Sequence, residues 1–105
     1  MTLRRVTNYV EDNLARNPTL TELSAVACMS PFHFSRTFKV STGLSPHQYV
    51  IQRRVGKAKR LLVNTDLPLI EIAYLCGFAD QIHLAKHTRR LLRTTPKALR
   101  LLVPD

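Results

Sequence analysis

An internal repeat with a spacing of about fifty residues constrains the fold of this chain more than any other feature of its sequence. The two copies align with an offset of 49 up to Phe78, and then with an offset of 50 because the second copy has one additional residue, Ala79. The aligned pairs are Leu20 with Leu69, Glu22 with Glu71, Leu23 with Ile72, Met29 with Phe78, Ser30 with Asp80, Phe34 with Leu84, Arg36 with Lys86, Ser45 with Thr95 and Pro46 with Pro96. Because helix caps, apolar positions and prolines recur together, the chain is predicted to contain the same helical unit twice.

The first copy has the pattern of two helices separated by a short turn. Thr19 and Glu22 have the spacing of a capping box, and Leu20, Leu23, Val26 and Ala27 are expected to form the buried face of the helix that follows. Ser30-Pro31 is a cap followed by a proline that suits the first helical position. Two helices about four residues apart, the second with a strong start signal, are typical of a helix-turn-helix.

The segment between the copies, residues 45–64, is predicted to be a long helix. Ser45 and Gln48 again have capping-box spacing, and Pro46 suits the first helical position. Its apolar residues recur at helical spacing and its basic residues lie between them. At about 1.5 Å per residue this helix would be roughly 30 Å long, close to the ~34 Å of one turn of B-DNA. It could therefore separate two DNA-reading units by one groove.

No segment alternates between apolar and polar residues with a period of two, so we expect no sheet. A further helix is predicted for residues 3–15, with one apolar stripe at spacings of three and four. The predicted fold class is all-α, with seven helices in two helix-turn-helix lobes joined by a long central helix. The expected parts are an N-terminal lobe (1–44), a linker helix (45–64) and a C-terminal lobe (65–105), which together form one DNA-binding domain.

Charge is distributed unevenly along the chain. The sequence has 16 Lys and Arg against seven Asp and Glu, for a net charge of +9. Residues 1–29 contain three residues of each sign, so residues 30–105 carry the whole excess. A one-sided positive charge favours a polyanionic partner, although a basic surface that serves only solubility is the alternative at this point.

The sequence contains no apolar run of eighteen residues and no signal peptide, so we expect a cytoplasmic protein with no membrane contact. Cys28 and Cys76 are then expected to be reduced, partly buried thiols. Two histidines, His83 and His87, lie four residues apart, but neither a third ligand at a suggestive spacing nor a pair of carboxylates accompanies them. We therefore expect no metal, no cofactor and no enzymatic activity.

The combined pattern resembles the DNA-binding domain of AraC/XylS-type transcription regulators, over essentially the whole chain from about residue 5. The residues that carry the resemblance are Ala27 to Pro31, Phe34, Arg36, Phe38, Lys39, Thr42 to Pro46, Arg54, Ala58, Leu61, Leu62, Ile72, Ala73, Cys76 to Phe78, Thr95 and Pro96. The resemblance implies a protein that binds double-stranded promoter DNA and activates transcription by contacting RNA polymerase. Most family members also carry an effector-binding or dimerisation domain. None is present in this chain, which is therefore expected to be a small stand-alone member or a fragment of a longer regulator.

The resemblance also implies which residues contact DNA. The expected base contacts are Phe32, Ser35 and Arg36 in the first recognition helix and Gln81, Ile82, Ala85 and Lys86 in the second. The expected phosphate contacts are Ser30, Lys39, Arg53, Lys57, His83, Arg89 and Arg90. Arginine suits guanine O6 and N7, glutamine suits adenine, and an aromatic ring can pack on a thymine methyl. Two alternatives stay open: Phe32 could tuck into its lobe, and His83 could cap its helix. Arg54 is expected to be structural and to pair with an acidic side chain.

Two departures from the family pattern fall in the second copy. Thr88 stands where the first copy has Phe38, and Arg93 stands where it has Gly43. A lost core ring and a non-glycine residue in a left-handed turn both reduce stability. We therefore expect the second lobe to be looser and to contribute less to sequence reading. The competing hypothesis for the whole chain is a protein-interaction module, such as an anti-activator, that uses the same helical scaffold.

Overall fold

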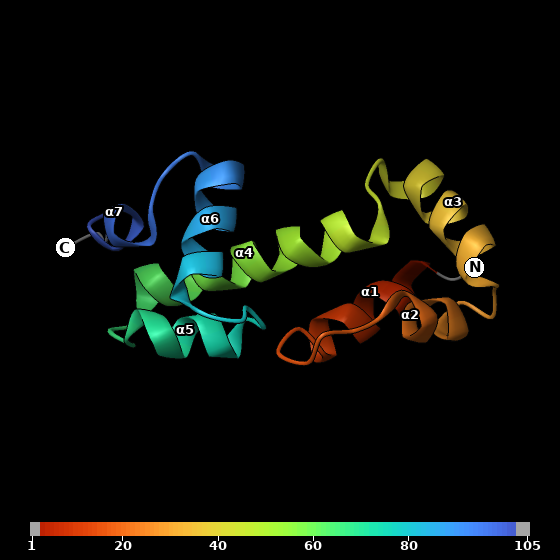
Figure 1. Ribbon diagram of the computed structural model, residues 1–105, viewed down its shortest axis with the longest axis horizontal. Coiled ribbons are helices and arrows are strands. Elements are labelled where there is room, and N and C mark those ends of the chain that lie inside the picture. The colour runs from red at the N-terminus through yellow and green to blue at the C-terminus, as the bar shows by residue number, and fades with distance from the viewer. Residues whose placement is uncertain (1–2, 103–105) are drawn as a thin grey trace. The chain divides into compact units, whose positions relative to one another are not determined.

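The computed structural model describes residues 3–102, which form seven α-helices and no strand, as Figure 1 shows. The helices are α1 (Leu3–Asp12), α2 (Leu20–Val26), α3 (Pro31–Thr42), α4 (Pro46–Asn64), α5 (Leu69–Leu75), α6 (Gln81–Leu92) and α7 (Pro96–Arg100). The predicted all-α fold is confirmed. No helix in this part of the chain combines the length and apolarity needed to cross a bilayer.

The chain divides into two compact units, which we call unit 1 (Met1–Ile51) and unit 2 (Gln52–Asp105). Helix α4 is continuous through the division, with residues 46–51 in unit 1 and the rest in unit 2. Its start has the predicted capping box: Gln48 N donates to Ser45 Oγ (3.2 Å), and Ser45 N donates to Gln48 Oε1 (3.0 Å). Because the division falls within α4, the part boundaries placed at residues 44 and 64 stay a prediction.

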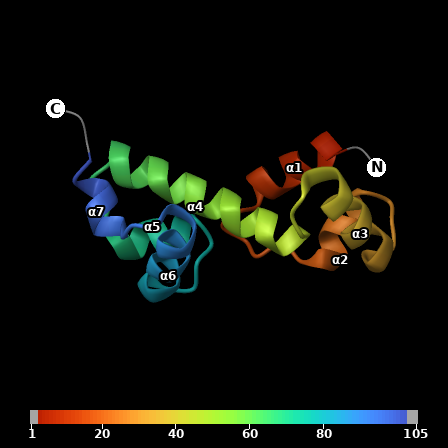
Figure 2. The same ribbon diagram turned by 90° about the horizontal axis from the view of Figure 1, so that it is seen from above.

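Unit 1 is held together by an apolar cluster that draws on all of its helices. The members are Val6, Val10, Leu14, Leu23, Ala27, Phe34, Phe38 and Val50, all of them buried. The ring of Phe38 lies between those of Phe34 (5.5 Å between centroids) and Tyr49 (5.4 Å). Helix α2 lies beside α3 in both Figure 1 and Figure 2. The cluster leaves the opposite face of α3 in solvent.

A polar contact that the sequence did not suggest ties α1 to α2. The Tyr9 hydroxyl donates to Glu22 Oε2 (2.7 Å), and Arg16 donates to both of them (3.0 and 3.1 Å). The hydrogen bond from Tyr9 and the Arg16 charge lower the pKa of Glu22. Helix α1 ends at Asp12 rather than at the expected Ala15, and Asn13 there donates its side-chain amide to the Tyr9 carbonyl (2.8 Å). Such side-chain bonds to the backbone compete with helix continuation.

Unit 2 packs α5, α6 and α7 about the remainder of α4. Its buried apolar residues are Val55, Ala58, Leu62, Ile72, Ala73, Cys76, Phe78, Leu84 and Leu99. Burial raises the pKa of the Cys76 thiol to about 11, so this residue behaves as a small apolar side chain. Arg100 donates to the carbonyls of Leu62 (3.4 Å) and Thr65 (3.3 Å), which satisfies backbone acceptors left open at the end of α4.

The two units repeat the same local structure. Helices α2 and α5 have seven residues each, and α3 and α6 have twelve each. Every residue of 81–96 is buried, half-buried or exposed as its counterpart fifty residues earlier is. The turns also match, because Met29 N donates to Ser24 O (3.0 Å) and Phe78 N donates to Ala73 O (2.9 Å). The predicted repeat is thus present in the packing as well as in the sequence.

Each unit has two residues with a positive φ, one in the turn between its two helix-turn-helix helices and one after the second of them. One of the two is a glycine in each unit, but in unit 1 it is the second and in unit 2 it is the first. After α2 the residue is Cys28 (φ 57°) and after α5 it is Gly77 (φ 86°). After α3 it is Gly43 (φ 79°) and after α6 it is Arg93 (φ 57°). Both units therefore carry one strained non-glycine turn, in opposite order.

Two burial predictions were wrong. Leu20, expected on the buried face of α2, is 42% exposed, because it is the first residue of the helix and burial begins one turn later at Leu23. Cys28, expected to be partly buried, is exposed in the left-handed turn after α2, whereas Cys76 is buried.

Candidate nucleic-acid interface

Helices α3 and α6 both begin at well-formed N-caps. Ser30 Oγ accepts from His33 N (3.3 Å), and Asp80 Oδ1 accepts from His83 N (2.9 Å). Both caps fix where α3 and α6 start, and the bond from His83 N lowers the pKa of Asp80. The Ser30 hydroxyl, expected at a phosphate, is thus used within the helix start, where the backbone amides of the first turn still favour anions.

The residues predicted to contact bases from α3 lie together on its solvent side. Phe32 is 73% exposed, so the alternative that it tucks into its lobe is wrong. The Arg36 guanidinium carbon lies 5.7 Å from the centroid of the Phe32 ring, within the range of a cation–π contact. Arg36 and Lys39 are exposed and Ser35 is half-buried. A shallow groove on this face is lined by Phe32, His33, Arg36, Thr37, Val40 and Ser41.

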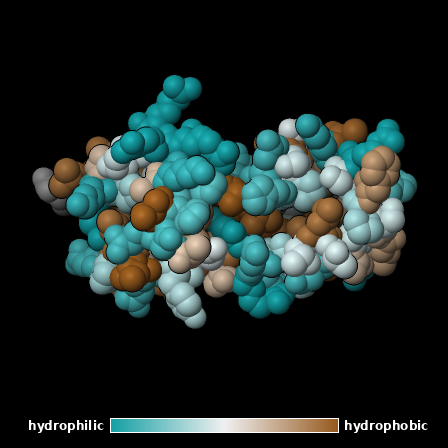
Figure 3. Space-filling view, in the orientation of Figure 1, coloured by the Kyte–Doolittle hydropathy of each residue, from teal (hydrophilic) through white to brown (hydrophobic). Residues whose placement is uncertain are grey.

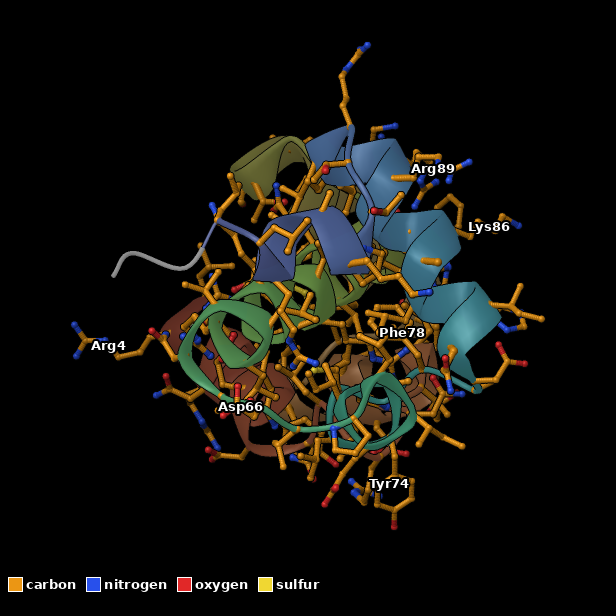
Figure 4. The ribbon with its side chains drawn as sticks, turned by 90° about the vertical axis from the view of Figure 1, so that its left-hand side faces the viewer. Arg4, Asp66, Tyr74, Phe78, Lys86 and Arg89 are labelled. Atoms are coloured by element: carbon orange, nitrogen blue, oxygen red, sulfur yellow. The ribbon has the colours of Figure 1, made fainter. Side chains whose placement is uncertain are left out.

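The corresponding residues of α6 are arranged in the same way within unit 2. Ile82 is 76% exposed, Gln81 and Lys86 are exposed, and Ala85 is half-buried. Figure 4 shows Lys86 and Arg89 projecting outward from α6, whereas Tyr74 projects from α5 in another direction. A shallow groove along this face is lined by Ile82, Ala85, Lys86, Arg89 and Arg90. The face combines apolar, amide and cationic groups, the types that can match base edges and phosphates.

His83 belongs to the start of α6 in this structure. Its Nδ1 lies 2.9 Å from Asp80 Oδ1, the same oxygen that caps the helix. Of the two roles left open for His83, a helix-capping contact is therefore present, and contact with a phosphate stays a prediction.

The basic residues of α4 do not share one environment. Lys57 Nζ donates to the Leu75 carbonyl (3.1 Å) at the end of α5, a helix-terminal contact that the sequence did not suggest. Arg54 is only 6% exposed, in agreement with a structural role, and burial lowers its pKa. Its pairing with an acidic side chain stays a prediction. Arg53 is half-buried. The Lys57 ammonium has three N–H donors, so it can donate to a phosphate while it holds this carbonyl, and its phosphate contact stays a prediction.

The histidine pair considered as a metal site is engaged elsewhere. The His87 ring stacks on Phe78 (5.6 Å between centroids, 22° between planes), and its Nδ1 lies 3.1 Å from an Arg90 guanidinium nitrogen. Among residues 3–102, no three His, Cys, Asp or Glu side chains are grouped so that they could hold a metal ion.

Charge is also segregated within the second half of the sequence. Residues 61–85 contain neither lysine nor arginine, and their charged residues are Asp66, Glu71 and Asp80. Lys86, Arg89 and Arg90 follow directly on α6. In Figure 4, Asp66 and Tyr74 lie away from Lys86 and Arg89, so Asp66, before α5, and the cations of α6 lie on different sides of unit 2.

A family model described as a helix-turn-helix domain matches residues 23–101, which covers most of the chain and both recognition helices. The chain belongs to the AraC/XylS-type helix-turn-helix family. The resemblance inferred from the sequence is confirmed. Members of this family are DNA-binding regulators rather than enzymes.

Similar proteins and structures agree with this assignment. The chain is 37% identical over 91 residues to LumQ of Photobacterium leiognathi, described as a probable transcriptional regulator, and 33% identical over 98 residues to the transcriptional activator RhaS of Enterobacter sp. (strain 638). These matches cover 87% and 93% of this chain but only 37% and 35% of those proteins. The chain thus spans little more than a third of the length of these relatives.

Two solved regulator domains have the same fold. The DNA-binding domain of AdpA, solved in complex with a target DNA, superposes with a TM-score of 0.88 at 36% identity and covers 94% of this chain and 89% of that one. The C-terminal domain of the response regulator yesN from Fusobacterium nucleatum superposes with a TM-score of 0.84 at 32% identity, covering 90% and 93%.

Proposed function

We propose that this chain binds double-stranded DNA as a monomer, with α3 and α6 in two successive major grooves, and that it regulates transcription as an activator. The observation that carries the proposal is the duplicated recognition surface. Residues 31–46 and 81–96 match in exposure at every position, and both present to solvent cationic side chains and the side chains that we predict to read bases. Since both copies lie in one polypeptide and run in the same direction, the target site should be asymmetric.

The predicted contacts divide into base readers and phosphate binders. The guanidinium of Arg36 can form a bidentate contact with guanine, worth about 1–3 kcal/mol of discrimination. Gln81 suits adenine, while Ile82 and Ala85 offer apolar contacts. Lys39, Arg89 and Arg90 are exposed and suit phosphates. We also propose RNA polymerase as the protein partner of the activator. We propose the cytoplasm as its location, because it acts on promoter DNA.

A binding-site selection with the purified chain, followed by footprinting, tests the proposal. We expect one asymmetric protected region of about 15–20 bp that covers two adjacent major-groove turns. With about six phosphate contacts, the affinity should fall roughly a thousandfold between 50 and 200 mM salt. A symmetric site bound by two copies of the chain would contradict the monomer model.

Two matched variants separate the roles of the residues on α3. Arg36→Lys keeps the charge but loses the bidentate fork, so it should weaken binding to the selected site and leave the salt slope unchanged. Lys39→Gln should reduce the salt slope by about one and weaken binding to all sequences alike. If both variants behave identically, the division into readers and binders is incorrect.

The second candidate function is a protein-interaction module. It is favoured by Ile70 and Tyr74 on α5, which are 63% and 75% exposed, whereas their counterparts in α2 are Thr21 and Ala25. Salt dependence discriminates the two functions. A chain that binds only proteins would show neither a selected DNA site nor the steep loss of DNA affinity with salt.

A further inference from the structure

The outer face of α3 carries two exposed apolar side chains on either side of Arg36. Phe32 is 73% exposed and Val40 is 87% exposed. The three residues follow one another at intervals of four, so they lie on one face of the helix. Val40 belongs to the same shallow groove as Phe32 and Arg36. Figure 3 shows hydrophobic and hydrophilic side chains mixed over α3.

Folding of unit 1 does not account for these two residues. Helix α3 is anchored in the core by Phe34 and Phe38, both of which are almost completely buried. Val40 is exposed enough that it contributes almost no burial to stability, and a β-branched residue is a mediocre helix former. An apolar residue at this position is therefore neutral or slightly unfavourable for the isolated unit.

The equivalent face of α6 differs at one of the three positions. Ile82 stands in the place of Phe32 and Lys86 in the place of Arg36, so apolar and cationic types are kept. Arg90 stands in the place of Val40. In Figure 3, hydrophilic side chains gather over the C-terminal end of α6. The fold tolerates a charged residue at this position of the repeat, so folding does not require the valine of α3. We therefore look for its role in what α3 contacts outside the unit.

We infer that Val40 is a specificity-determining residue of the first half-site, where its side chain contacts the C5-methyl group of a thymine. The inference rests on the proposed DNA-binding function and names one further contact residue, Val40, and the base that it contacts, thymine. The thymine methyl is the apolar group that the major-groove edge of DNA offers to a side chain like valine. Arg36 lies four residues away on the same face. Because Arg36 is cationic, this face matches a polyanion better than it matches an apolar protein surface.

The spacing of the three side chains gives the expected base pattern. Eight residues of α-helix separate Phe32 from Val40, a rise of about 12 Å. That rise spans at most three to four base pairs at ~3.4 Å per pair, because a helix in the major groove is inclined to the DNA axis. The first half-site should therefore carry two thymine methyls about that far apart, on either strand, with the guanine read by Arg36 between them. The second half-site should carry such a methyl opposite Ile82 and none opposite Arg90.

Replacement of each thymine of the selected first half-site by deoxyuridine tests the inference, because only the methyl group is lost. At two positions we expect the affinity to fall about three- to fivefold, the effect of one buried methyl. Val40→Ala should abolish the response at one of the two positions and leave the other unchanged. Phe32→Ala should do the reverse. Alanine is the best helix former, so neither exposed substitution should unfold α3.

The matched control is Arg90→Ala at the equivalent position of α6. It should reduce the salt slope by about one and change no single uridine response. A Val40→Ala protein that retains both uridine effects in the first half-site overturns the inference, as does a selected half-site without two thymines at this spacing. Those results leave the proposed function intact if a selected site exists. Binding with no preferred sequence would refute the proposed function itself.

Discussion

The hydroxyl group of Thr88 is buried in unit 2 at a cost that a single substitution can measure. Thr88 is 1% exposed, and its Oγ1 has no hydrogen-bond partner among the residues that the structure describes. A buried hydroxyl without a partner costs about 1–3 kcal/mol. Valine has the same branched shape without the hydroxyl, so Thr88→Val should raise the free energy of unfolding by about 1–2 kcal/mol.

Urea unfolding followed by circular dichroism measures this change. The midpoint should rise while the slope of the transition stays the same, because no additional surface is exposed on unfolding. Amide exchange in α5 and α6 should slow if the gain is located in unit 2.

Ser24→Ala is the matched control, because Ser24 is also buried but its hydroxyl donates to the Thr21 carbonyl (3.0 Å). Loss of a satisfied hydrogen bond should lower the free energy of unfolding by about 0.5–1.5 kcal/mol. The two substitutions should therefore have opposite signs. If the Thr88→Val protein is no more stable than the wild type, burial of the Thr88 hydroxyl does not destabilise the fold, which refutes the reasoning.

Three further predictions concern the turns, the caps and the units. Cys28→Gly and Arg93→Gly should each raise the free energy of unfolding by about 1 kcal/mol in urea titrations, because glycine relieves the strain of a positive φ; unchanged midpoints would contradict this. The lowered pKa of Asp80 means that its contribution to stability is present above the unfolded-state pKa and is lost as the pH falls through the folded-state value. The stability difference between wild type and Asp80→Ala should thus narrow below about pH 4 in acid titrations, and a difference that stays constant would exclude this role. Unit 2 should show lower hydrogen-exchange protection than unit 1, since it has Thr88 in place of Phe38, whereas each unit has one non-glycine residue in a left-handed turn; equal protection would refute the predicted looseness.

The helix starts were predictable because each depends on a cap residue and a backbone N–H only three residues further along the chain. Ser30, Ser45, Asp80 and Thr95 each accept the backbone hydrogen bond that their position in the sequence indicates. The faces of α3 and α6 followed from the period of the helix once those starts were known. The interior partners Phe34 and Leu84 are both buried as expected.

Contacts between residues far apart in the sequence were not predictable in the same way. The hydrogen bond from Lys57 to the Leu75 carbonyl spans 18 residues, and that from Arg100 to Leu62 spans 38. A basic side chain at helical spacing looks the same in a sequence whether it meets a phosphate or a backbone carbonyl. The DNA contacts of Arg53, Lys39 and the other basic residues consequently stay predictions, although their exposure is now known.

The segregation of charge in unit 2 has a consequence for the encounter with DNA. Within unit 2, residues 61–85 carry only acidic charges, whereas residues 52–60 and 86–100 carry its lysines and arginines, so the unit has an electric dipole as well as a net charge. In the field of a phosphate backbone such a body experiences a torque before any atoms touch. Collisions would begin with the acidic stretch 61–85 turned away from the duplex, which reduces the number of unproductive orientations.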